Sequence, residues 1–96
     1  MVYKILFTDD ALVDLEIILD YVRADNPSAA ERFGTSLLNH VELLQSFPRV
    51  GMPVPKRPGI RKILHTPVRV YYRLHEDLGL IEILHFWHSY RRDPQL

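Results

Sequence analysis

The 96-residue sequence contains no cysteine, a single tryptophan and no net charge at pH 7 when histidine is neutral. The absence of cysteine excludes a disulfide framework, a thiolate metal site and a cysteine nucleophile. No apolar run approaches the roughly 20 residues that cross a bilayer, and the first residues lack the pattern of a signal peptide. We therefore expect a cytoplasmic protein without membrane contact, folded as one domain over residues 1–96.

Motifs for nucleotide binding, hydrolysis and metal binding are missing as well. The chain has no G-x-G-x-x-G, no Walker motif, no G-x-S-x-G and no H-E-x-x-H. These absences argue against a nucleotide-binding fold, a serine hydrolase and a zinc site. We expect no metal and no cofactor.

Charge is divided between the two halves of the chain. Residues 1–48 carry eight acidic and three basic side chains, whereas residues 49–96 carry nine basic and four acidic ones. The second half also holds four of the five histidines. Charge of one sign in one region costs self-repulsion and usually meets an oppositely charged partner. We interpret the basic half as the working surface, facing something anionic, and the acidic half as its helical support.

The first half predicts a short strand followed by a helical hairpin. Residues 3–7 alternate partly, and Thr8 or Asp9 can cap the next helix. Asn26 is a suitable N-cap for a second helix that begins at Pro27. A connection this short makes the two helices antiparallel neighbours. Their apolar stripes are Ala11, Leu12, Leu15, Ile18, Leu19 and Val22, then Ala30, Phe33, Leu37, Val41 and Leu44.

The second half predicts a proline-rich loop over residues 48–59 and strands over about 60–65, 68–75 and 80–88. The last strand is apolar on both faces, which indicates a central position. In the middle strand, the predicted helix-facing residues are Val68, Val70, Tyr72 and Leu74, and the predicted outward residues are Arg69, Tyr71, Arg73 and His75. The predicted fold is α+β, in the order β-α-α-β-β-β, with a helical hairpin on one face of a mainly antiparallel sheet.

Cationic side chains are predicted to gather on the outward sheet face. They are Arg61, Arg69 and Arg73, with Arg91 and Arg92 of the C-terminal segment. Arginine binds phosphate oxygens bidentately and stabilises the charge of a phosphoryl transition state. A nearby His88 or Tyr90 would move a proton, as in a metal-independent ribonuclease. In the alternative interpretation the arginines are solvated or paired with acidic residues, and His88 is a packed residue near a strand end.

The order and spacing of several motifs resemble the RelE/ParE superfamily of toxins, over about residues 3–94. In the helical hairpin these motifs are Asp10-Ala11, Asp14-Leu15, Ile18, Tyr21, Asn26-Pro27, Ala29-Ala30, Arg32-Phe33, Leu44, Pro48 and Gly51. In the strands they are Arg61-Lys62-Ile63, Arg69-Val70-Tyr71-Tyr72, Ile83-Leu84, His88 and Arg91.

The resemblance implies the toxin of a bacterial type II toxin–antitoxin system of the plasmid-stabilisation type. Such a toxin arrests growth, is neutralised by a cognate antitoxin in a hetero-oligomer, and binds operator DNA through that antitoxin. ParE-like members inhibit DNA gyrase and are not known as nucleases. RelE-like members cut messenger RNA on the ribosome.

The same residues take different roles in the two branches. In a RelE-like endoribonuclease the catalytic candidates are Arg61, Arg69, Arg73, His88, Tyr90 and Arg91. In a ParE-like toxin a binding surface is formed by Arg61, Arg69, Arg73, Arg91 and Arg92. Ile63 stands where the RelE-like pattern has a second lysine, and the neutral chain differs from the strongly basic ribosome-dependent ribonucleases. The resemblance therefore favours gyrase inhibition, with mRNA cleavage as the alternative.

Overall fold

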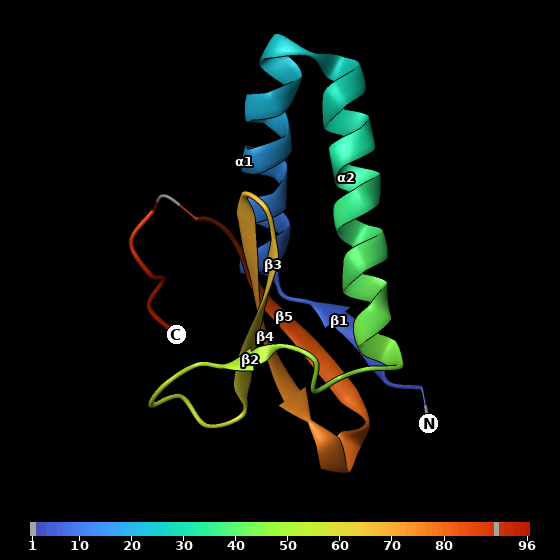
Figure 1. The fold of residues 1–96 in the computed structure, drawn as a ribbon, viewed down its shortest axis with the longest axis vertical. Helices are drawn as coiled ribbons and strands as arrows, with labels where there is room; N and C mark the ends of the chain where they lie inside the picture. Colours follow the sequence, from blue (N-terminus) through green and yellow to red (C-terminus); the bar gives the residue numbers. More distant parts are fainter. Residues whose placement is uncertain (1, 90) are drawn as a thin grey trace.

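The structure, a computed structural model, describes residues 2–89 and 91–96 and combines a helical hairpin with a five-stranded sheet (Figure 1). The elements are β1 (Lys4–Phe7), α1 (Asp9–Asp25), α2 (Pro27–Glu42), β2 (Met52–Pro53), β3 (Ile60–His65), β4 (Val68–His75) and β5 (Leu80–His88). Short 3-10 turns follow α2 at Leu43–Gln45 and β4 at Glu76–Leu78. The predicted α+β class and element order are confirmed, and the two-residue β2 is an addition within the predicted loop. No helix in the described residues is long and apolar enough to cross a membrane.

Short polar side chains define the start of each helix. Thr8 Oγ1 accepts a hydrogen bond from the Ala11 amide at 3.1 Å, and Asn26 Oδ1 accepts one from the Ala29 amide at 3.1 Å. Thr8 also donates its hydroxyl to the Ile83 carbonyl at 2.9 Å, which ties the start of α1 to β5. Because Asn26 ends α1 and caps α2, the hairpin turns within a single residue.

The sheet has the strand order β1-β5-β4-β3-β2. β1 runs parallel to the first half of β5, and every other pair is antiparallel. The predicted central position of β5 is therefore correct for residues 80–83, which have β1 on one side and β4 on the other. Beyond them the register shifts, because Tyr71 pairs with His85 whereas Tyr72 pairs with Ile83. Leu84 is thus the extra residue of a β-bulge, which bends β5 where β1 ends.

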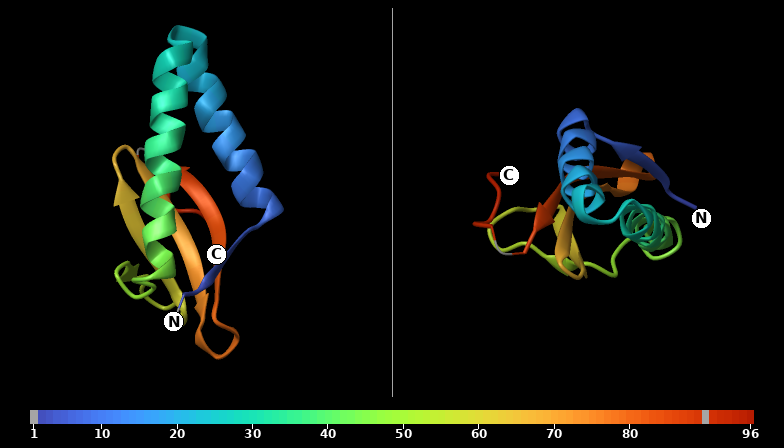
Figure 2. Two further views of the ribbon diagram at one scale, coloured as in Figure 1. Left: turned by 90° about the vertical axis from the view of Figure 1, so that its right-hand side faces the viewer. Right: turned by 90° about the horizontal axis from the view of Figure 1, so that it is seen from above.

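The helices cover one face of the sheet (Figure 2). The core between them consists of Ala11, Leu37, Val41, Leu44, Ile63, Val68, Val70, Tyr72, Ile81, Ile83 and Phe86. The stripe predicted for α2 is confirmed. The stripe predicted for α1 is only partly correct, because Leu12 is 50% exposed.

The second face of the sheet is partly covered as well. Residues 91–96 lie on the side of the sheet away from α2 (Figures 1 and 2). Tyr71, predicted to face outward, is on this face but is only 2% exposed. The guanidinium of Arg69 lies 5.7 Å from its ring centroid. Burial raises the pKa of the Tyr71 hydroxyl, and the nearby Arg69 charge partly offsets that effect.

Candidate functional site

Arg61 lies on the side of the sheet that carries the helices. It is paired with Tyr72, and residues directly opposite each other in neighbouring strands point to the same face. Its Nη1 donates to the carbonyls of Gly51 at 2.8 Å and Arg49 at 3.2 Å. The expectation that Arg61 shares a face with Arg69 is therefore wrong. Arg61 instead fastens the loop that follows α2.

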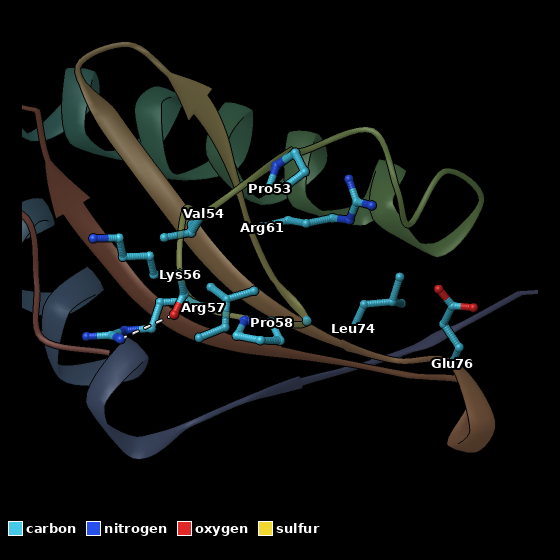
Figure 3. Close-up of a pocket in the computed structure, with 10 residues that line it drawn as sticks. Pro53, Val54, Lys56, Arg57, Pro58, Arg61, Leu74 and Glu76 are labelled. Carbon is cyan, nitrogen blue, oxygen red and sulfur yellow. Dashed lines mark hydrogen bonds between the residues drawn. The ribbon is translucent and has the colours of Figure 1, made fainter.

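The loop over residues 53–59 adds cations that do not converge with Arg61. It borders a pocket of about 410 Å³ at the start of β3 and the end of β4 (Figure 3). Figure 3 shows the side chains of Lys56 and Arg57 ending on the opposite side of this pocket from the Arg61 guanidinium. Glu76, at another edge of the pocket, is bound by both Nε and Nη2 of Arg49. That hydrogen-bonded pair lowers the pKa of the Glu76 carboxyl. The pocket is thus not a focused anion site.

Arg69 and Arg73 are both on the open sheet face, four residues apart on β4, and each has an acidic partner. Arg69 Nη1 donates to Asp93 at 2.6 Å, and its Nη2 donates to the Arg91 carbonyl at 3.2 Å. The side chain of Arg69 is 17% exposed. Arg73 Nε lies 4.0 Å from a Glu82 carboxylate oxygen and the side chain is 39% exposed. Arg73 is therefore the more accessible of the two cations.

The C-terminal segment is attached to this face by an aromatic contact. The Arg91 guanidinium lies 3.9 Å from the centroid of the Trp87 ring. Trp87 Nε1 donates to the Arg92 carbonyl. Both arginine side chains are exposed. Tyr90, the other candidate in this segment, lies outside the described residues.

His88 is on the opposite side of the sheet from Arg69 and Arg73. It pairs with Val68, which is fully buried beneath the helices. The Arg61–Tyr72 row lies four residues along β4 from the His88 row, which corresponds to about 13 Å. His88 is consequently not brought together with Arg61, Arg69 or Arg73, whereas Arg91 lines the same groove as His88.

His88 instead lines an apolar groove between the helical hairpin and the sheet. The groove has a volume of about 650 Å³. It is bordered by Asp14, Ile17, Ile18, Tyr21, Val22, Ala29, Phe33, Pro67, Val68, Phe86, His88 and Arg91. Ile17 and Tyr21, one turn apart on α1, are 63% and 79% exposed. An exposed apolar surface of this kind, with a cation in its lining, is typical of a protein-binding site.

Asp14 and His85 form a pair that sequence reasoning missed. Nδ1 of His85 donates to Oδ2 of Asp14 at 2.8 Å, and both side chains are less than one-fifth exposed. The β-bulge at Leu84 lies directly before His85. The acidic partner of His85 on α1 carried no signal in the sequence.

The family model for the ParE toxin of the type II toxin–antitoxin system parDE matches residues 5–92. The chain belongs to the ParE toxin family. It is thus a toxin of a type II toxin–antitoxin system. No curated protein sequence matches this ParE-family toxin.

Solved structures agree on the fold. A chain of the chromosomal ParDE TA system from P. aeruginosa is 24% identical, with a TM-score of 0.75, covering 91% of this chain and 96% of that one. A chain of the toxin–antitoxin complex RelBE2 from Mycobacterium tuberculosis is 22% identical, with a TM-score of 0.65, covering 92% and 99%. Both confirm the predicted RelE/ParE fold for this ParE-family toxin.

Proposed function

We propose that this ParE-family toxin arrests growth by inhibiting DNA gyrase through a protein contact. The observation that carries the proposal is the separation of His88 from Arg69 and Arg73, two of the arginines that RNA cleavage would need beside it. Arg69 and Arg73 belong to one face of the sheet, and His88 belongs to the other. General acid–base catalysis requires the proton-transfer group within hydrogen-bond reach of the reacting atoms. A recognition surface has no such requirement.

The open face supplies the recognition surface in this proposal. Arg73 and the exposed Arg91 and Arg92 offer cations, and Trp87 adds an aromatic side chain between the strands and the C-terminal segment. Arginine and tryptophan are enriched among the residues that dominate binding energy at protein interfaces. This surface would be complementary to an acidic patch on the target.

Neutralisation would occur at the apolar groove, which adjoins this recognition surface at Arg91. We propose that a segment of a cognate antitoxin occupies it, buries Ile17 and Tyr21, and places an acidic side chain near Arg91. The antitoxin would also carry the complex to operator DNA. A hetero-oligomer formed in this way would remove the most exposed large apolar side chains of α1, Ile17 and Tyr21, from water.

The target is tested by pulse labelling after induced expression in a bacterial host, following methionine and thymidine incorporation together. Gyrase inhibition predicts an early fall in thymidine incorporation, and purified toxin should inhibit DNA supercoiling. An early fall in methionine incorporation would overturn the proposal in favour of mRNA cleavage. Arg73→Ala should weaken the toxicity, whereas Arg23→Ala, on the exposed surface of α1, should not.

The antitoxin groove is tested by placing a carboxylate on its apolar surface. Ile17→Asp should weaken binding of the protein encoded beside the toxin gene by at least tenfold, because a carboxylate would be placed against an apolar partner. Leu78→Asp is the matched control, since Leu78 is 69% exposed and lies outside the groove. Equal affinity of the two variants would show that the antitoxin binds elsewhere.

A further inference from the structure

Two histidines from distant parts of the chain meet beside α2. His40, in the last turn of α2, and His65, the last residue of β3, have their Nδ1 atoms 2.8 Å apart. Ser36 Oγ lies 3.3 Å from Nε2 of His65. Because Ser36 and His40 are one helical turn apart, α2 contacts both ring nitrogens of His65 at once. Phe33, one turn further back, packs against the same ring at 5.6 Å between centroids.

We propose that His40 and His65 form a chelating site for a divalent transition-metal ion that favours square-planar or tetragonal coordination, such as Cu²⁺ or Ni²⁺. Imidazole nitrogen is a preferred ligand of these ions. Among the described residues no cluster of three or more histidine, cysteine, aspartate or glutamate side chains is suited to a metal. The site therefore offers two protein nitrogens, with water completing the coordination.

The two nitrogens are already close enough to bind one ion. Two nitrogens bound at roughly 2.0 Å to one ion lie about 2.8 Å apart when the angle at the ion is 90° and about 3.3 Å apart when it is tetrahedral. The observed separation is 2.8 Å. The hydrogen-bonded pair therefore already has about the spacing of adjacent positions in a tetragonal site. The rings must turn so that both lone pairs point at the ion.

Ser36 supplies the support that such a ligand needs. The tautomer in which His65 Nε2 donates its proton to Ser36 Oγ leaves the Nδ1 lone pair of His65 available for the metal. In the metal-free pair, His40 Nδ1 then donates to His65 Nδ1. When the ion binds, His40 changes tautomer: its proton is carried on Nε2 instead of Nδ1. The Nδ1 lone pair of His40 is then available for the metal. Metal ligation requires both imidazoles to be neutral.

The location of the site gives the ion a structural consequence. His40 belongs to the helical hairpin and His65 to the sheet, so one ion would cross-link the two layers. An ion that binds the folded state and not the unfolded state raises the melting temperature. We expect an increase of roughly 5 °C or more when Cu²⁺ is saturating.

The test is a Cu²⁺ titration of the full-length, untagged chain, followed by electron paramagnetic resonance and thermal unfolding. We expect one tetragonal Cu²⁺ per chain with nitrogen ligands. His40→Asn and His65→Asn should each abolish this signal and the rise in melting temperature. His75→Asn removes a histidine that is bound to Glu82 and lies at the opposite end of β4 from Val68, the residue paired with His65; it is the matched control and should leave both unchanged.

A further variant distinguishes loss of a metal ligand from a folding defect in the histidine variants. Ser36→Ala keeps both ligands and should weaken Cu²⁺ binding about tenfold, the cost typical of losing a group that orients a metal-bound histidine. Far-ultraviolet circular dichroism checks that each variant is folded. The proposal is overturned if folded His40→Asn or His65→Asn binds Cu²⁺ as the unmodified chain does, or if Zn²⁺ binds more tightly than Cu²⁺.

Discussion

The carboxylate of Asp14 in α1 accepts a hydrogen bond from Nδ1 of His85 in β5, 71 positions away in the chain. The two atoms are 2.8 Å apart. His85 also meets Trp87 edge-on, with 5.5 Å between ring centroids, and Trp87 carries the stacked Arg91. A continuous set of contacts therefore runs from α1 through the bulged part of β5 to the C-terminal segment. The hydrogen bond from His85 to Asp14 is the first of these contacts.

Replacement of Asp14 by alanine should lower the free energy of unfolding by about 1–3 kcal/mol, because it leaves the mostly buried Nδ1 of His85 without its acceptor. Urea denaturation measures the effect. Glu16→Ala is the matched control on the same helix, since Glu16 is exposed, and it should change the free energy by less than about 0.5 kcal/mol. Equal effects of the two substitutions would contradict the role of the Asp14–His85 pair.

Replacement of Tyr72 by phenylalanine should also destabilise the fold. The Tyr72 hydroxyl donates to the Pro48 carbonyl at 2.7 Å and accepts from the Gly51 amide at 3.0 Å, so its loss leaves two backbone groups unpaired. We expect a cost of about 1–3 kcal/mol in the free energy of unfolding. Tyr21→Phe, at a 79% exposed position, should be close to neutral in the same denaturation experiment.

Alkaline pH provides an independent check on Tyr72. Burial, the largest cause, raises the pKa of its hydroxyl. A raised pKa in the folded state means that the neutral form is favoured by folding. The resulting contribution to the free energy of unfolding is fully present below the unfolded pKa of about 10, and it is lost as pH rises through the folded pKa. Tyr72→Phe should therefore show a smaller loss of stability above pH 10 than the unmodified chain. An unchanged pH profile would argue against the burial of this hydroxyl.

The order of the elements followed from local signals in the sequence. Asn26 and Pro27 carry their own capping chemistry, and the alternation of Val68, Val70 and Tyr72 identifies the buried face of β4 without any knowledge of its neighbours. The three C-terminal strands agree in their bounds for the same reason. Signals of this kind act over a few residues and can be read from a single sequence.

The grouping of the candidate site residues depended on register, which is not local. Arg61 lies in a strand whose alternation is consistent with either face until its pairing with Tyr72 is known. The bulge at Leu84 likewise shifts the faces of the residues after it. The contacts of Asp14 with His85 and of His40 with His65 join elements that no sequence spacing relates. These contacts required the tertiary structure.

Mild acid should weaken the link between α2 and β3. Burial, followed by the charge of His40, lowers the pKa of His65. With a lowered folded pKa, the unfolded state binds more protons, so the contribution to stability is present above the unfolded pKa of about 6.5 and is lost as pH falls through the folded value. Urea midpoints between pH 5 and 7.5 should show this decline, and His65→Asn should reduce it. His75→Asn is the control; the same reduction in both variants would contradict the assignment.

Two glycines should respond oppositely to replacement by alanine. A Cβ at Gly51 would lie 2.6 Å from the Tyr72 hydroxyl oxygen and 2.9 Å from the Lys62 carbonyl oxygen, and this backbone atom cannot move away cheaply. Gly51→Ala should therefore cost about 1–3 kcal/mol and loosen the loop that Arg61 holds. At Gly34, inside α2, the nearest atom would be a Leu19 methyl group at 3.4 Å, an ordinary contact. Gly34→Ala should be neutral or stabilising by up to about 1 kcal/mol, because alanine favours the helix. Thermal unfolding of the two variants distinguishes these outcomes, and a stabilising Gly51→Ala would disprove the close approach of this loop to Tyr72.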